Sequence, residues 1–208
     1  MEDYNKIIES LGIKYVKSSN VKVTNPFSIK DYEETDNALI ILKKGVIKFG
    51  KSQETLPEGH VLFIPARRLT PLSFGNVEDK SPKLSLEEFG FKQTEYFKSS
   101  IPKDSPEVAV ADFTLVVFET KVFDTVNFFT ALDIPAFPLE NSTINNIIYE
   151  IMTEQQRNRE GNQRVVKINT ELLVIEIIRH ILENRLYVEQ MATNSTYFKD
   201  PRLISLFK

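Results

Sequence analysis

The stretch ALIILKKGVIKFGKSQETLPEGHVLFIP, residues 38–65, consists of four short strand-like segments, three of them mainly apolar, separated by turn residues. The segments are residues 38–42, 46–49, 54–56 and 60–64, and glycine or proline lies between or directly after them. Strands this short and this closely spaced predict an antiparallel barrel or sandwich. Because residues 38–42 carry no polar side chain, we expect that strand to be buried on both faces.

The sequence before residue 38 and after residue 65 predicts secondary structure less clearly. Residues 1–36 are mixed and polar, with a turn signal at Asn25-Pro26, and we expect them to form an arm over the main body. Residues 76–107 contain three X-Pro pairs and several charges, which predicts a long loop with little regular structure. Residues 108–118 form a further strand-like segment, and residues 122–129 are another apolar stretch, with three phenylalanines.

After Glu140 the apolar spacing changes from two residues to about 3.6, which predicts two helices. Asn141 or Ser142 can cap the first helix, which we expect to end by Gly161, and the second should begin near Thr170. The second helix has a broad apolar stripe: Leu172, Leu173, Ile175, Ile177, Ile178, Ile181, Leu182 and Leu186. The stripe is wider than one packing partner requires, so we expect part of it to contact a second subunit.

The composition excludes several classes of function. The 208 residues include no cysteine, which excludes disulfides, thiolate metal sites and cysteine nucleophiles. The formal net charge is −3 with lysines scattered among glutamates, so we do not expect this chain itself to hold nucleic acid. The start MEDYNKIIES lacks the features of a signal peptide, and no apolar run approaches the length of a membrane span. We therefore expect a cytoplasmic protein without membrane contact.

Three motifs follow one another in an informative order. Residues 58–65, EGHVLFIP, resemble the first motif of the cupin superfamily, with His60 where that superfamily usually has Asp or Asn. Residues 118–140, FETKVFDTVNFFTALDIPAFPLE, are similar to the matching segment of AraC-type transcription regulators from Bacteroidetes-like bacteria. Residues 200–204, DPRLI, resemble the start of the helix-turn-helix domain in those regulators. The order of barrel motif, two helices, polar linker and DPR-type helix is also that of the family.

The resemblance implies a mainly β fold with C-terminal helices, in which a cupin-like antiparallel β-barrel (a double-stranded β-helix) precedes a helical pair. It divides the chain into an N-terminal arm (1–36), a barrel (37–138), a helical dimerisation pair (139–190), and a linker with the start of a helix-turn-helix domain (191–208). The family's barrel binds a small effector and its helices form a homodimer. The implied function is effector sensing and dimerisation, with DNA bound only through a C-terminal domain that this chain lacks.

The histidines argue against metal chemistry. Cupin enzymes hold a metal with an HxH pair, a glutamate and a third histidine, and these ligands must converge inside the barrel. The chain has two histidines, His60 and His180, and the second lies on the apolar second helix. We therefore expect no metal site, no cofactor and no enzymatic activity. His60 should hydrogen-bond locally at its turn, and His180 should lie at a core edge or an interface.

The candidate ligand contacts are Arg67, Arg68, Phe113 and Glu119. Successive side chains of a strand point to opposite faces, so we expect one of the two arginines in the barrel mouth, where its guanidinium suits a carboxylate ligand. A surface salt bridge to Glu58 or Glu119 is the other interpretation of these arginines. The phenylalanines are expected mostly in the core, with one or two lining a pocket. The candidate dimer contacts are Leu172, Ile175, Ile178 and Leu182.

Two other functions stay open at this point. One is a free-standing cupin that binds a small molecule, with residues 200–208 as a native helical tail. The other is a cupin enzyme acting on a sugar or acid, which the shortage of histidines disfavours. A parent gene that continues with two helix-turn-helix patterns would favour the regulator.

Overall fold

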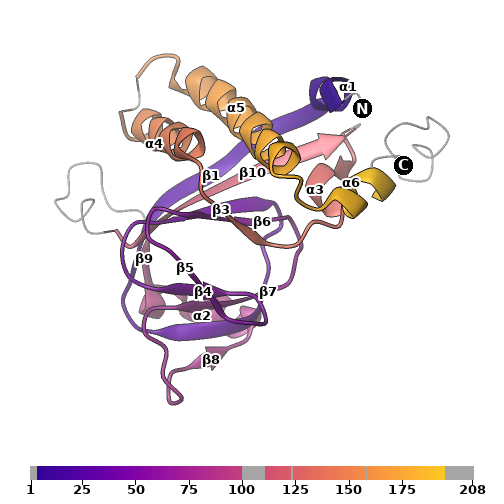
Figure 1. Ribbon diagram of the computed structural model, residues 1–208. Coiled ribbons are helices and arrows are strands. Elements are labelled where there is room, and N and C mark those ends of the chain that lie inside the picture. The colour runs from indigo at the N-terminus through magenta and orange to yellow at the C-terminus, as the bar shows by residue number, and fades with distance from the viewer. Residues whose placement is uncertain (1–3, 100–110, 123, 158, 195–208) are drawn as a thin grey trace.

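The computed structural model describes residues 4–99, 111–122, 124–157 and 159–194. Two β-sheets lie face to face, and helices cover the outer face of one of them (Figure 1). The layers are therefore helices, sheet A and sheet B, in that order.

Sheet A has seven strands, all paired antiparallel. In spatial order they are β12 (Phe137–Leu139), β6 (Val61–Ile64), β3 (Asn37–Leu42), β10 (Phe113–Val122), β1 (Leu11–Val23) and β9 (Phe97–Ser99), while β11 (Val126–Asn127) also pairs with β10. The register between β1 and β10 shifts between Tyr15 and Lys17, which marks a β-bulge at Val16.

Sheet B has five strands: β5 (Glu54–Leu56), β4 (Ile47–Phe49), β7 (Thr70–Phe74), β2 (Phe27–Tyr32) and β8 (Lys83–Leu84). The β2–β8 pair is parallel and the others are antiparallel. As far as the structure describes the chain, the two sheets are separate and open at their edges. The mainly antiparallel β fold with C-terminal helices is confirmed, whereas the closed cupin-like barrel is not.

The central strands of sheet A, β3, β6 and β10, are apolar on both faces because they lie between two cores. In β3, Ala38, Ile40 and Leu42 point into the core between the sheets. Leu39 points to the opposite side and joins the core beneath the helices. The expectation that residues 38–42 are buried on both faces is confirmed for all but the half-buried Ile41.

The helical layer consists mainly of α4 (Ser142–Arg157) and α5 (Asn162–Glu183). The side-chain oxygen of Asn141 accepts hydrogen bonds from the backbone N–H groups of Thr143 (2.9 Å) and Ile144 (3.2 Å), which confirms the expected cap. The prediction for the second helix was wrong, since α5 begins eight residues before Thr170. In its first turns the apolar side chains of Val165 and Ile168 are exposed. The sequence there therefore lacks the pattern of apolar buried positions and polar exposed positions by which a surface helix is identified.

Residues 11–32 do not form a separate arm, because β1 lies within sheet A and β2 within sheet B. β1 contains three lysines and the polar run Ser18-Ser19-Asn20, so its sequence is too polar to be identified readily as a strand. Residues 4–9 form the short helix α1 (Tyr4–Glu9).

The expected loop at residues 76–107 also contains regular structure. It includes β8, β9 and the helix α2 (Leu86–Tyr96), while residues 100–107 lie outside the described part. α2 starts with a capping box in which Ser85 and Glu88 exchange side-chain-to-backbone hydrogen bonds. That signal, Ser-x-x-Glu, was present in the sequence.

Two short helices complete the fold, α3 (Phe128–Ala131) and α6 (Val188–Asn194). α6 occupies the start of the expected linker, and its Met191 is buried in the core beneath the helices. The DPR-type helix expected at residues 200–208 lies outside the described residues. None of the helices in the described ranges has both the length and the apolar composition needed to cross a lipid bilayer.

Candidate functional site

The four candidate ligand residues lie in three different places. Phe113 lines a cavity between the two sheets. Arg67 and Glu119 line a separate, charged groove beside α3. Arg68 reaches away from both and pairs with Asp133. The structure does not bring the four residues together in one site.

The interior cavity has a volume of about 330 Å³ and lies between sheet A, sheet B and α2. Its apolar wall includes the rings of Phe74, Phe89, Phe97 and Phe113. These rings pack on one another, with centroids 5.0 Å apart for Phe74 and Phe97 and 5.4 Å apart for Phe97 and Phe113. Edge-to-face packing of this kind fixes the rings and so gives the wall a defined shape.

The polar rim of the cavity centres on Glu34. Lys17 Nζ lies 3.6 Å from Glu34 Oε2, and the Tyr32 hydroxyl donates a 2.7 Å hydrogen bond to Glu34 Oε1. Burial raises the pKa of Tyr32 well above its usual value, and the neighbouring Glu34 adds to this effect. Tyr32 is therefore a neutral hydrogen-bond donor at physiological pH.

α2 closes one side of the cavity. Phe89 and Gln93 from this helix line it. The end of the helix is held by hydrogen bonds to the backbone oxygen of Glu95, from Thr24 Oγ1 (2.6 Å) and Asn25 Nδ2 (2.9 Å). Only Phe89 and Tyr96 of the helix are buried. The cover is thus attached by the packing of these two rings and by the hydrogen bonds at its C-terminal end.

The charged groove has a volume of about 650 Å³ and is lined by the β2–β3 loop, the β6–β7 loop, β10 and α3. Glu119 forms an ion pair with Lys121, and a hydrogen bond from Lys121 to this carboxylate raises the pKa of Lys121. Arg67 is exposed and has a left-handed backbone (φ 55°), with its N–H bonded to the Glu34 carbonyl at 2.8 Å. The expected salt bridge between either arginine and Glu58 or Glu119 is not among the ion pairs of the described chain.

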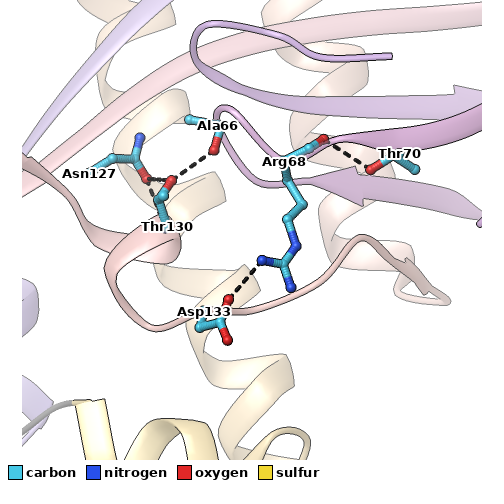
Figure 2. Close-up of polar contacts among 6 residues, drawn as sticks. All are labelled: Ala66, Arg68, Thr70, Asn127, Thr130 and Asp133. Atoms are coloured by element: carbon cyan, nitrogen blue, oxygen red, sulfur yellow. Dashed lines mark hydrogen bonds and ion pairs between the residues drawn. The ribbon is translucent and has the colours of Figure 1, made fainter. Parts of the chain in front are cut away.

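Arg68 instead belongs to a cluster that ties the β6–β7 loop to α3. Figure 2 shows Arg68 reaching Asp133, whose carboxylate lies 2.7 Å from its Nη1 atom. Beside this pair, the Thr130 hydroxyl donates a 2.8 Å hydrogen bond to the Ala66 carbonyl, and Asn127 caps α3. α3 carries Phe128 and Phe129 into the core beneath α4 and α5. The loop is thus connected through α3 to the helical layer.

α5 is apolar on two opposite faces. Leu173, Ile177 and Ile181 lie on one face and are fully buried against sheet A and α4. The opposite face, here called the outer stripe, consists of Val165 (40% exposed), Ile168 (48%), Leu172 (39%) and the half-buried Ile175. With 100° between successive residues, these four positions fall on one side of the helix.

The candidate dimer contacts divide between these two faces. Leu172 and Ile175 belong to the outer stripe. Ile178 is 1% exposed and lies in the chain's own core, where a second subunit cannot reach it. Leu182 is half-buried and packs against the same core. Val165 and Ile168 were not among the candidates because the apolar pattern predicted a helix start after them.

The histidines lie apart from both pockets. His60 Nε2 is 4.0 Å from the Glu140 carboxylate, and His180 lies on α5, where burial lowers its pKa. No group of three or more His, Asp or Glu side chains within the described residues is arranged to hold a metal ion. The interior cavity has an apolar wall and a polar rim in which the charges of Lys17 and Glu34 balance each other. Such a lining suits the binding of a small molecule.

Sequence reasoning missed Lys17, Tyr32 and Glu34, which form the rim. They lie in the segment expected to be an arm, and 15 residues separate Lys17 from Tyr32. Lys17 and Tyr32 lie on β1 and β2, whose partial alternation of polar and apolar residues is a weak strand signal, and Glu34 lies two residues after β2.

Comparison with known proteins finds likeness in structure and none in sequence. No protein-family model and no curated protein matches the chain. Its fold is similar to that in a crystal structure of an apo ToxT variant from Vibrio cholerae strain SCE256, with a TM-score of 0.42 and 10% sequence identity. The match covers 82% of this chain and 56% of the ToxT chain, so the chain spans a little over half the length of that protein. At this TM-score the likeness supports no conclusion about the site or the activity.

Proposed function

We propose that this chain is the effector-sensing and dimerisation part of an AraC-type transcription regulator. The observation that carries the proposal is the combination of an interior cavity with a helix, α5, that is apolar on two opposite faces. A free-standing binding protein needs the cavity but has no use for the exposed outer stripe. A sensor in which ligand binding changes the pairing of two copies needs both the cavity and the outer stripe. The order of sequence motifs, from the cupin-like segment to the DPR-type segment, supports the same assignment.

In this proposal the sandwich of residues 11–139 binds the effector, and α4 and α5 present the dimer face. DNA is read by a helix-turn-helix domain that follows residue 208. The proposal assigns no catalytic step, cofactor or metal to the sandwich, and it places the protein in the cytoplasm, where such regulators act.

The outer stripe is suited to a second copy of itself. Arg164 and Glu171 flank the stripe on the same side of α5. An antiparallel two-fold pairing centred on Ile168 therefore places each arginine beside the glutamate of the other copy. Such an isologous contact buries the apolar stripe and pairs the flanking charges at the same time.

Light scattering at micromolar concentration tests this dimer. We expect the chain to be dimeric and Ile168→Glu to be monomeric, because the new carboxylate would be buried without a partner. Phe91→Glu is the matched control, since Phe91 is 83% exposed on α2 and lies outside the stripe. A monomeric wild-type chain, or loss of the dimer in the control alone, would contradict the proposal.

A charge exchange separates a true interface from a change in folding. Arg164→Glu should weaken the dimer, and adding Glu171→Arg to the same chain should restore it, because the pair is then present with reversed signs. If the double variant is weaker than the single variant, the antiparallel pairing about Ile168 is wrong.

A further inference from the structure

Given the sensing function proposed above, the interior cavity is the effector site, and its lining limits the kind of molecule it accepts. Its volume of about 330 Å³ is at the lower end of the range for ligand pockets. An engineered cavity of roughly 150 Å³ already accommodates benzene. The four packed phenylalanine rings of the wall offer a rigid apolar surface to a body of one or two rings.

The charges at the rim balance one another. Lys17 and Glu34 are the two charged side chains among the described lining residues, and they form an ion pair with each other at 3.6 Å. The second carboxylate oxygen of Glu34 accepts the hydrogen bond from Tyr32. A ligand ion would therefore lose its hydration without meeting an unpaired opposite charge, which is unfavourable.

The rim still offers hydrogen bonds to an uncharged group. The side chains of Ser19, Gln93 and Ser99 line the cavity and form no hydrogen bond within the described ranges. A hydroxyl and a primary amide both donate and accept. They can bind a neutral polar head without any change in the net charge of the rim.

We propose that the interior cavity binds a neutral amphipathic molecule, with a compact aromatic or alicyclic body against the phenylalanine wall and an uncharged hydroxyl or amide head at the Ser19–Gln93 rim. The Lys17–Glu34 pair acts as a selectivity device, because it rejects both anions and cations that carry the same body.

Three probes with one body test the charge preference directly. 2-Phenylethanol, phenylacetate and 2-phenylethylammonium share a phenyl ring and differ in head charge, and calorimetric titration of the 208-residue chain compares them. We expect saturable binding of the alcohol, at least about tenfold tighter than either ion, because desolvation of an unpaired charge opposes binding of the ions. Equal or tighter binding of either ion, or no binding of the alcohol, overturns the proposal.

Removing the charge of either Lys17 or Glu34 should change the preference of the cavity for neutral over charged probes in a predictable direction. Glu34→Gln leaves Lys17 without its partner, so we expect phenylacetate to gain at least about fivefold relative to the alcohol. Lys17→Met leaves the Glu34 carboxylate, so the ammonium probe should gain instead. A purely structural role for the pair would weaken all three probes equally, and that result contradicts the selectivity claim.

A mouth variant establishes where the probe binds. Gln93 and Thr94 are adjacent, exposed residues of α2, and only Gln93 lines the cavity. Gln93→Trp should reduce alcohol binding at least about tenfold by filling the mouth, while Thr94→Trp should leave it unchanged. Equal effects of the two variants would place the alcohol elsewhere. Dimerisation is measured without any probe, so a dimeric chain that binds no alcohol refutes the ligand class and leaves the proposed function standing.

Discussion

The guanidinium of Arg68 and the carboxylate of Asp133 join the β6–β7 loop to the end of α3, with Nη1 and Oδ1 2.7 Å apart (Figure 2). The side chains are 40% and 68% exposed, so solvent screens their attraction. The contact orients the loop more than it stabilises the fold. It also explains why Arg68, a candidate ligand contact, lies in neither pocket.

Removing this ion pair should therefore change stability little. Asp133→Asn keeps a residue type that tolerates the left-handed backbone at this position (φ 55°). We expect the free energy of unfolding to fall by no more than about 1 kcal/mol. Chemical denaturation measures this, and a loss above about 2 kcal/mol would show that the pair is more than a surface contact.

Phe63 should be far more important for stability. Its ring is fully buried and contacts Phe118, Phe129 and Phe137 at centroid distances of 6.4, 4.8 and 5.5 Å. Phe63→Ala should lower the free energy of unfolding by about 3–5 kcal/mol, because it leaves a cavity between sheet A and the helical layer. Phe91→Ala, at a position that is 83% exposed, should change it by less than about 0.5 kcal/mol.

The capping box of α2 should control the cover of the interior cavity. Ser85→Ala removes the hydrogen bond from the Glu88 N–H to the Ser85 hydroxyl, which should weaken the helix start by about 1 kcal/mol. Hydrogen exchange should then be faster in the first turn of α2, while exchange in α5 stays unchanged. Faster exchange throughout the chain would indicate global destabilisation instead.

His180 should make stability depend on pH below neutrality. Burial lowers its pKa in the folded chain, although Glu183 opposes the shift. The unfolded chain then binds the proton more readily, so this contribution to stability is present above the ordinary histidine pKa of about 6.5 and is lost as the pH falls below it. Denaturation between about pH 7.5 and 5.5 should show this decline, and His180→Gln should reduce it. An unchanged slope in the variant would assign the decline to other groups.

Much of the fold could be predicted from local patterns. The run at residues 38–42 is apolar on both sides of the strand, and it does lie between two cores. Asn141 precedes an apolar helix pattern and does cap α4. Both are local features whose effect depends on a few neighbouring residues. The strands β1 and β2 were missed because many of their residues are polar and face solvent or the cavity rim. Only part of each strand is buried, so the apolar pattern that identifies a strand is weak there.

The site was less predictable because it is assembled from distant segments. Phe113 was a candidate, yet its neighbours Phe74 and Phe97 come from a sheet B strand and from a strand that follows α2. Glu34, two residues after β2, meets Lys17 of β1 because these two strands lie in facing sheets. On α5, the buried Ile178 and the exposed Leu172 look alike in sequence, and only the packing of the helix on sheet A distinguishes them.

The most direct measurement is the affinity of 2-phenylethanol for the wild-type chain and for Ile168→Glu. If the chain is a sensor, occupancy of the interior cavity and pairing through α5 are coupled, and linkage requires each to change the other by the same factor. We predict affinities that differ at least about fivefold between dimer and monomer, the usual lower limit of such coupling. Equal affinities in the two states would contradict the account, because the chain would then bind a ligand and form a dimer without connecting the two.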